Sequence, residues 1–153
     1  LFGFFDAYSD RVREFDPLPE AATYIEDPAD LVFDHRLPLE VDYRHILFEH
    51  EERLPQVLWG NQALAHNAME GAVRRLLVRL RRDYRLAVPG WHNGRIQLLL
   101  PLCLMNEQVA DVVLVAERDA ARGKYTARTI LSLDLAYVNA RVLCAQDGQW
   151  LKP

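Results

Sequence analysis

The sequence predicts a single α+β domain, residues 1–153, in which an antiparallel sheet of three to five strands packs against a long amphipathic helix and a C-terminal helix. Short apolar runs separated by turn residues fill the second half of the chain, and such runs are typical of buried strands. A long segment with helical periodicity precedes them and a shorter one follows them. A chain of this length, half of it hydrophobic, is sufficient for one domain with its own core.

The first residues predict a strand and a short helix. The aromatic content of residues 1–7 favours a strand, and Ser9 is a suitable cap for a helix over residues 10–15. The chain starts at Leu1 without a methionine and on an apolar run. We therefore expect the sequence to be the C-terminal part of a longer protein, with residues 1–5 as a candidate edge for dimerisation.

An edge segment and a helix are predicted next. Residues 31–39 are expected to form a loop or a short strand, which Pro38 restricts to a sheet edge because proline lacks an N–H group. Asp42 is a suitable cap for a helix over residues 43–53. Pro55 marks the end of that helix.

The segment from Asn61 to Tyr84 is the clearest helix in the sequence, and Asn61 is a good cap residue. Seen down the helix axis, apolar residues gather on one side and arginines on the other. The apolar side consists of Ala65, Met69, Ala72, Val73, Leu76, Leu77, Leu80 and Tyr84. The opposite side, here named the arginine face, consists of Arg74, Arg75, Arg79, Arg81, Arg82 and Arg85.

Three strands and a final helix complete the predicted domain. Pro89-Gly90 breaks the chain, and Asn93-Gly94 is a strong turn signal. The strands are expected over residues 95–104, 111–117 and 125–131. Their connections are too short for a parallel return, which needs about a dozen residues, so we expect them to be antiparallel. Ser132 caps the last helix, Asp147-Gly148 ends it, and Trp150 is expected to pack back on the domain.

Charge is unevenly distributed along the chain. The net charge is −4, which on its own argues against a nucleic-acid-binding protein. Residues 1–56 contain 14 acidic and 5 basic residues, however, and residues 57–153 contain 8 acidic and 13 basic residues. A basic face can therefore exist on an acidic protein.

Several classes of protein and site are not predicted. No run reaches the roughly 20 apolar residues of a membrane span, and no signal peptide is expected. Cys103 and Cys144 lie in apolar patterns, so we expect reduced core residues in a cytoplasmic protein. No metal site is expected, because no Cys or His spacing matches zinc and Asp27, Asp30 and Asp34 lack the glycine and glutamate of an EF-hand. No cofactor motif occurs either.

Several blocks of the sequence resemble one known family. They are Asp27 to Asp34 (DPADLVFD), Asp42 to Ile46 (DYRHI), Gly94 to Leu104 (GRIQLLLPLCL), Ala110-Asp111, Glu117-Arg118 and Tyr125 to Arg141 (YTARTILSLDLAYVNAR). In these blocks, and over nearly all of residues 1–150, the chain is similar to the OST-HTH-associated domain. Members of that family stand beside LOTUS winged-helix domains, cold-shock-like domains and NYN-type nuclease domains. The resemblance implies a role in RNA metabolism with such domains as partners, and it supplies no catalytic residues.

The arginine face is the first candidate site. Arginine binds phosphate through two N–H groups and stacks on bases, and neutralising phosphates releases counterions. Our leading hypothesis is a non-catalytic RNA-binding or RNA-processing accessory domain. The alternative is a solvated helix face paired with the acidic residues of the first 56 positions. The expected RNA-binding residues are Arg74, Arg75, Arg79, Arg81, Arg82, Arg85, Trp91 and Arg95.

The turn from Trp91 to Arg95 is the second candidate. Together with Tyr84, Trp91 and Arg95 can stack on unpaired bases, as in single-strand binders. His92 can act as a general acid or base. An ordinary surface turn is the alternative interpretation.

A metal-independent ribonuclease is the runner-up function. Its candidate catalytic residues are His92, Tyr125, Asn139 and Arg141. Polar residues where the last strand meets the last helix can line a site, or they can form a structural hydrogen-bond network. The predicted sheet with flanking helices is similar to small microbial ribonucleases and toxins, which is a likeness of fold alone. A protein-interaction module that forms homodimers is the third possibility.

Overall fold

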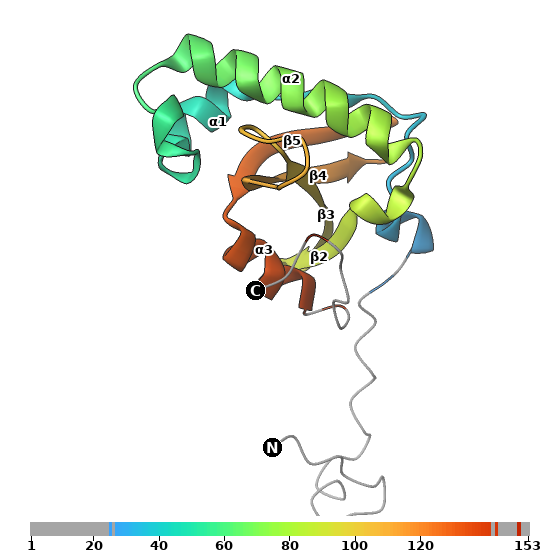
Figure 1. The fold of residues 1–153 in the computed structure, drawn as a ribbon. Helices are drawn as coiled ribbons and strands as arrows, with labels where there is room; N and C mark the ends of the chain where they lie inside the picture. Colours follow the sequence, from blue (N-terminus) through green and yellow to red (C-terminus); the bar gives the residue numbers. More distant parts are fainter. Residues whose placement is uncertain (1–24, 26, 142, 144–149, 151–153) are drawn as a thin grey trace, which may run out of the picture.

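The computed structural model describes residues 25, 27–141, 143 and 150 (Figure 1). The elements in chain order are η1 (Pro28–Leu31), β1 (Leu39–Val41), α1 (Tyr43–Glu49), η2 (Glu51–Arg53), η3 (Gln56–Leu58), α2 (Gln62–Leu80), η4 (Tyr84–Leu86), β2 (Val88–His92), β3 (Arg95–Leu102), β4 (Val112–Asp119), β5 (Lys124–Leu131) and α3 (Leu133–Arg141). The expected strand over 1–7, the helix over 10–15, Cys144 and the helix end at 147–148 lie outside the described residues. The single α+β domain is confirmed.

One five-stranded sheet has the order β1-β5-β4-β3-β2. Strands β2 to β5 form an antiparallel meander, as the short connections require. The expectation of a wholly antiparallel sheet is wrong at one edge, because β1 pairs in parallel with β5, from Leu39 beside Tyr125 to Val41 beside Ala127. The chain between these two strands contains two α-helices and three strands, which is ample length for a parallel return.

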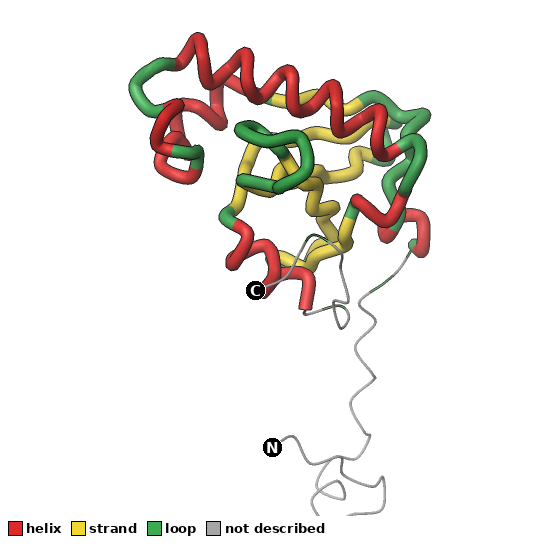
Figure 2. Tube along the Cα trace, in the orientation of Figure 1, coloured by secondary structure: helices red, strands yellow, loops and turns green. Residues whose placement is uncertain are grey.

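Helices α1 and α2 cover one face of the sheet (Figures 1 and 2). The side chains of Leu98, Leu100 and Leu102 on β3 and of Val112, Leu114 and Ala116 on β4 are buried in this layer. The buried residues of α2 are Ala65, Met69, Ala72, Val73, Leu76 and Leu80, which confirms the predicted apolar side except at its end. Tyr84 lies beyond the helix and is 61% exposed.

Helix α3 packs on the opposite face, mainly against β2 and β4. The second core combines Val88, Leu99, Val113 and Val115 of the sheet with Ala136 and Ala140 of the helix. Trp150 packs against this core and donates its indole N–H to the carbonyl of Leu86 at 3.1 Å, as expected for an anchor. Strands β3 and β4 are thus buried on both faces.

Both long helix predictions run past the true ends. The Asn61 side chain caps α2 by accepting from the Leu64 N–H, and the helix stops at Leu80 because Asp83 begins a new turn, accepting from the Arg85 N–H. Helix α1 stops at Glu49. The chain after it is tied to β5, since the Arg53 guanidinium donates to the Ile130 carbonyl at 2.6 Å.

The turn residues before β3 behave in two ways. Asn93 and Gly94 both have positive φ, 49° and 78°, and join β2 to β3 as a two-residue hairpin, which confirms the turn. Pro89 and Gly90 do not break the chain but lie within β2. A proline is tolerated there because β2 is an edge strand, and a Cβ on Gly90 would come within 2.9 Å of Leu99 Cδ1.

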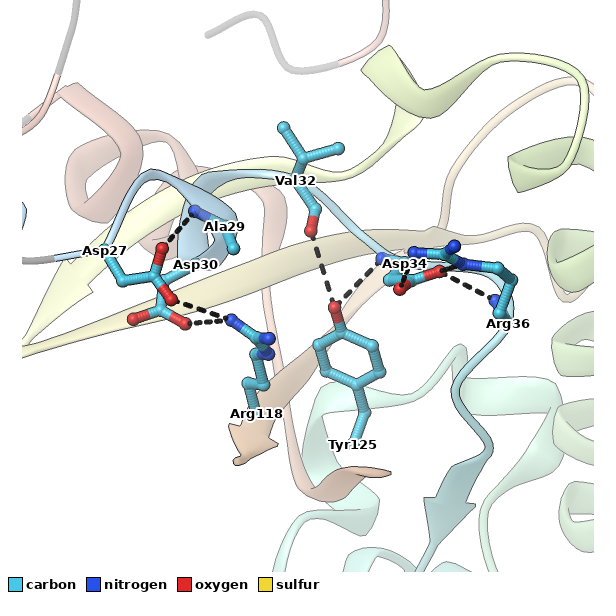
Figure 3. Close-up of polar contacts among 8 residues, drawn as sticks. All are labelled: Asp27, Ala29, Asp30, Val32, Asp34, Arg36, Arg118 and Tyr125. Atoms are coloured by element: carbon cyan, nitrogen blue, oxygen red, sulfur yellow. Dashed lines mark hydrogen bonds and ion pairs between the residues drawn. The ribbon is translucent and has the colours of Figure 1, made fainter. Parts of the chain in front are cut away.

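The segment before β1 is clasped to the ends of β4 and β5 (Figure 3). The Tyr125 ring stacks on Phe33 with centroids 4.5 Å apart, and its hydroxyl accepts from the Asp34 N–H at 2.9 Å. The Arg118 guanidinium pairs with Asp30 at 3.0 Å and with Asp27 at 3.3 Å. Burial raises the pKa of the Tyr125 phenol, which keeps it neutral. The clasp thus joins three stretches that are far apart in the sequence, the segment from Asp27 to Asp34, Arg118 and Tyr125, into one structural unit.

Substituting Tyr125→Phe tests the clasp. The variant keeps the ring stack but leaves the half-buried Asp34 N–H without its acceptor, so we expect a loss of about 1–2 kcal/mol in the free energy of unfolding. Urea denaturation measures this loss. The control Tyr84→Phe removes a hydroxyl from an exposed ring and is expected to leave the free energy unchanged.

Candidate functional site: two separate polar surfaces

The arginine face is divided by its contacts. Arg74 pairs with Glu70 one turn earlier at 2.7 Å, and Arg85 pairs with Asp83 at 2.9 Å. The Asp83 carboxylate raises the pKa of Arg85, and Arg85 lowers that of Asp83. These two cations are already locally neutralised, although exposed pairs of this kind are individually weak, up to about 1 kcal/mol.

Two further arginines lie over the end of β3 instead of facing away from the domain. The Arg75 guanidinium donates to the Cys103 carbonyl at 3.1 Å, and that of Arg79 reaches Cys103 Sγ and the Glu107 carbonyl, both at 3.5 Å. Together with the buried Cys103, both arginines line a cavity of about 280 Å³. The helical wheel does not show these contacts, because it ignores how far an arginine side chain can bend, and the assignment of Arg75 and Arg79 to RNA binding stays a prediction.

Arg81 and Arg82 remain as the open part of the arginine face. Both are exposed, and within the part of the chain that the structure describes neither forms an ion pair or a side-chain hydrogen bond. The exposed Tyr84 ring follows them in the chain. We name Arg81, Arg82 and Tyr84 the basic corner.

The turn from Trp91 to Arg95 does not adjoin the basic corner. Strand β2 runs five residues from the end of η4 to this turn, a distance of about 13 Å. Helix α2 makes its sheet contacts with β3, whereas β2 packs with α3 in the other layer. Strand β2 thus separates the turn from the basic corner along the chain.

A polar pocket lies on the α3 side of the sheet, where the helix leaves part of the face uncovered. It holds about 500 Å³ and is lined by His45 of α1, His92 of β2, Gln97 of β3, Val115 and Glu117 of β4, Thr126, Arg128, Thr129 and Leu131 of β5, and Asn139 of α3. Gln97 lies two residues before Leu99 and Glu117 two residues after Val115, so their side chains share the face that α3 covers further along.

The pocket gathers some of the candidate catalytic residues and not others. His92 and Asn139 both line it. Tyr125 does not, because its side chain is fully buried on the other face of the sheet in the clasp. Of Arg141 only the backbone is described, so its candidate role lies outside what the structure addresses. In this structure Tyr125 is a core residue and is not part of the pocket.

Sequence reasoning missed Gln97 and Glu117. The amide nitrogen of Gln97 donates to Glu117 Oε1 at 2.6 Å across the β3–β4 pair. The sequence did contain a signal for them. Each is a polar residue at a position where the alternation of its strand predicts an inward-facing side chain. Only the pairing of the two strands shows that these residues meet.

Arg128 owes its position to a β-bulge. Val115 pairs with Thr129 and the next residue, Ala116, pairs with Ala127, which leaves Arg128 as the extra residue. Its side chain is 67% exposed, and its Nε lies 3.8 Å from Asp42 Oδ2, a loose contact. Arg128 thus lines the pocket as an exposed cation.

His50 borders the same region. Its Nε2 lies 3.0 Å from Thr129 Oγ1, and its ring meets that of His45 edge-on at 6.1 Å. Burial lowers the pKa of His50, and the neighbouring Arg53 cation lowers it further. His50 is therefore held neutral beside the pocket.

The lowered pKa of His50 predicts a pH dependence of stability. The unfolded chain binds a proton at His50 below about pH 6.5 and the folded chain does so only at lower pH. The contribution of the neutral His50 ring to the free energy of unfolding is thus fully present above pH ~6.5, and it is lost as the pH falls toward the pKa of His50 in the folded protein. Unfolding free energies between pH 5 and 7.5 should fall less steeply with acid in His50→Gln than in the original chain. An NMR titration of the His50 ring with a midpoint at or above 6.5 would contradict this.

Among the described residues, no group of three or more His, Cys, Asp or Glu side chains is placed to hold a metal ion. Asp27 and Asp30 bind Arg118, and Asp34 binds Arg36, whose hydrogen bonds hold the pKa of that carboxyl far below its usual range. In the described part of the chain, no helix has both the length and the apolar content of a membrane span.

Comparison with known proteins gives one match. The profile of a family described as a domain of unknown function, DUF3825, matches residues 1–150. No curated protein and no solved structure matches the chain. Because the match spans almost the whole sequence, this chain belongs to the DUF3825 family.

Proposed function

We propose that the chain is an RNA-binding accessory domain that holds single-stranded RNA at the basic corner. The observation that carries the proposal is the state of Arg81 and Arg82, which are exposed and have no carboxylate partner among the described residues. Two unpaired arginine side chains can each form bidentate hydrogen bonds with one of two successive phosphates. The adjacent exposed Tyr84 ring offers a stacking surface for a base.

The resemblance to the OST-HTH-associated domain supports RNA as the partner, since domains of that type stand beside RNA-binding and nuclease domains. In this proposal the neighbouring domains select the RNA sequence or catalyse a reaction on the RNA, and this domain increases the affinity for RNA. A cytoplasmic location belongs to the same proposal, and the buried free thiol of Cys103 is consistent with it.

Substitutions at the basic corner test the proposal. In Arg81→Gln and Arg82→Gln, each loss of a phosphate contact should weaken binding to labelled single-stranded RNA for all sequences alike. It should also reduce the slope of log affinity against log salt by about 0.7. Fluorescence anisotropy at four salt concentrations measures both effects.

The matched control is Arg44→Gln, which removes the same charge from the exposed surface of α1. This variant should keep the salt slope of the original chain. Equal slopes for all four proteins, or no RNA binding by the original chain, would remove the basis for the proposed function.

The polar pocket favours a second function, metal-independent cleavage of RNA. It brings His92 together with Arg128 and Asn139, a titratable ring with a cation and an amide. RNA is incubated with the protein in the presence of a chelator and then recovered. The original chain should shorten the RNA, and the His92→Ala variant should leave it intact. RNA that stays intact with the original chain would leave only the accessory function. Protein interaction through residues 1–5 falls outside the described residues.

A further inference from the structure

The polar pocket has the composition of a site for one planar polar ligand. Its floor is apolar where Val115 and Leu131 continue the second core. Its walls are polar, and its volume of about 500 Å³ lies in the range of small-molecule sites. An apolar floor with few fixed polar groups suits the flat face and polar edge of a nucleobase.

The Glu117 carboxylate is the fixed polar group of the pocket. It is half-buried, and its one hydrogen-bond donor among the described residues is the Gln97 amide, at 2.6 Å. It forms no ion pair in the described part of the chain. An ionised carboxylate accepts hydrogen bonds through both oxygens and donates none, so the ligand edge that fits it must present donors side by side.

Among the four bases this requirement selects guanine. The Watson–Crick edge of guanine carries two adjacent donors, N1–H and the N2 amino group. Adenine and cytosine each place one amino group beside an acceptor nitrogen, and uracil places one N–H between two carbonyls. A carboxylate held by Gln97 would meet an acceptor on each of those edges, which costs affinity.

A phosphate group has a partner at the mouth of the same pocket. Arg128 is carried outward by the bulge in β5, and its contact with Asp42 at 3.8 Å is too long to hold it. It can therefore turn to a phosphate without breaking a hydrogen bond that the fold needs.

We propose that the polar pocket binds one guanine nucleotide, with Glu117 accepting hydrogen bonds from N1–H and N2–H and Arg128 binding the phosphate. The inference rests on the proposed RNA-binding function for the source of that nucleotide, a single-stranded RNA that also contacts the basic corner. A free guanine nucleotide presents the same edge and the same phosphate, and the experiment separates the two sources.

The first experiment titrates the full chain with GMP, IMP, AMP, CMP and UMP by calorimetry. We expect GMP to bind at least about 10-fold more tightly than AMP, CMP or UMP, since a bidentate pair discriminates strongly. IMP lacks only the N2 amino group, so it should bind several-fold more weakly than GMP. Equal affinity for GMP and IMP, or for GMP and AMP, overturns the proposal without any variant.

Variants then assign the roles. Glu117→Gln should abolish the preference for GMP over AMP, whereas the control Glu49→Gln on the exposed surface of α1 should keep it. Arg128→Gln should weaken all the nucleotides alike and leave the preference intact. A preference that survives Glu117→Gln in a variant with an unchanged melting temperature overturns the assignment.

The second experiment compares nine-residue RNAs of uridine with a single central G or a single central A. Tighter binding of the G oligomer than of GMP supports RNA as the source, and equal binding supports the free nucleotide. Equal affinity for the G and A oligomers, with the salt slope still dependent on Arg81 and Arg82, overturns the pocket proposal and leaves the basic corner intact. Selective GMP binding without any oligomer binding supports the pocket and removes the RNA-binding function.

Discussion

The two-sided burial of β3 and β4 is the constraint on which the rest of the domain depends. Five consecutive residues of each strand, 98–102 and 112–116, are buried. A single helix layer would leave one row of these side chains in water, at about 25 cal/mol for each Å² of apolar surface. The chain therefore needs α2 on one face and α3 on the other, and both helices flank the meander in sequence.

The same constraint explains why the polar pocket exists. Helix α3 ends at Arg141 and covers only the apolar part of its sheet face. Where β3 and β4 extend past that cover, the inward positions change to Gln97 and Glu117. A polar side chain on the inward face of a buried strand reaches water only where no helix covers it. The end of α3 therefore coincides with the change from apolar to polar residues on this face.

The fold could be predicted largely from the sequence, and the site could not. Strand positions, the hairpin at Asn93-Gly94 and the long helix follow from local periodicity, which acts over a few neighbouring residues. The parallel pairing of β1 with β5 depends on residues distant in the chain, and no local pattern reports it. The expectation of a wholly antiparallel sheet is therefore wrong at this edge.

The arginine residues show the same limit. A helical wheel places side chains by direction alone, and it grouped Arg75 and Arg79 with Arg81 and Arg82. The first two bend over the end of β3, which the wheel does not contain. Tyr125 is a candidate catalytic residue by its residue type, but it is a core residue in the structure because Phe33 stacks on its ring. Phe33 is distant from Tyr125 in the sequence, so no local pattern reports this contact.

The edge position of β1 has a consequence for the order in which the domain assembles. Strands β2 to β5 and α3 are joined by short connections, so their contacts form with little loss of loop entropy. Leu39 can dock beside Tyr125 only after β5 exists, and this contact closes most of the chain into one loop. The meander is thus suited to be the folding nucleus and β1 the last element to join.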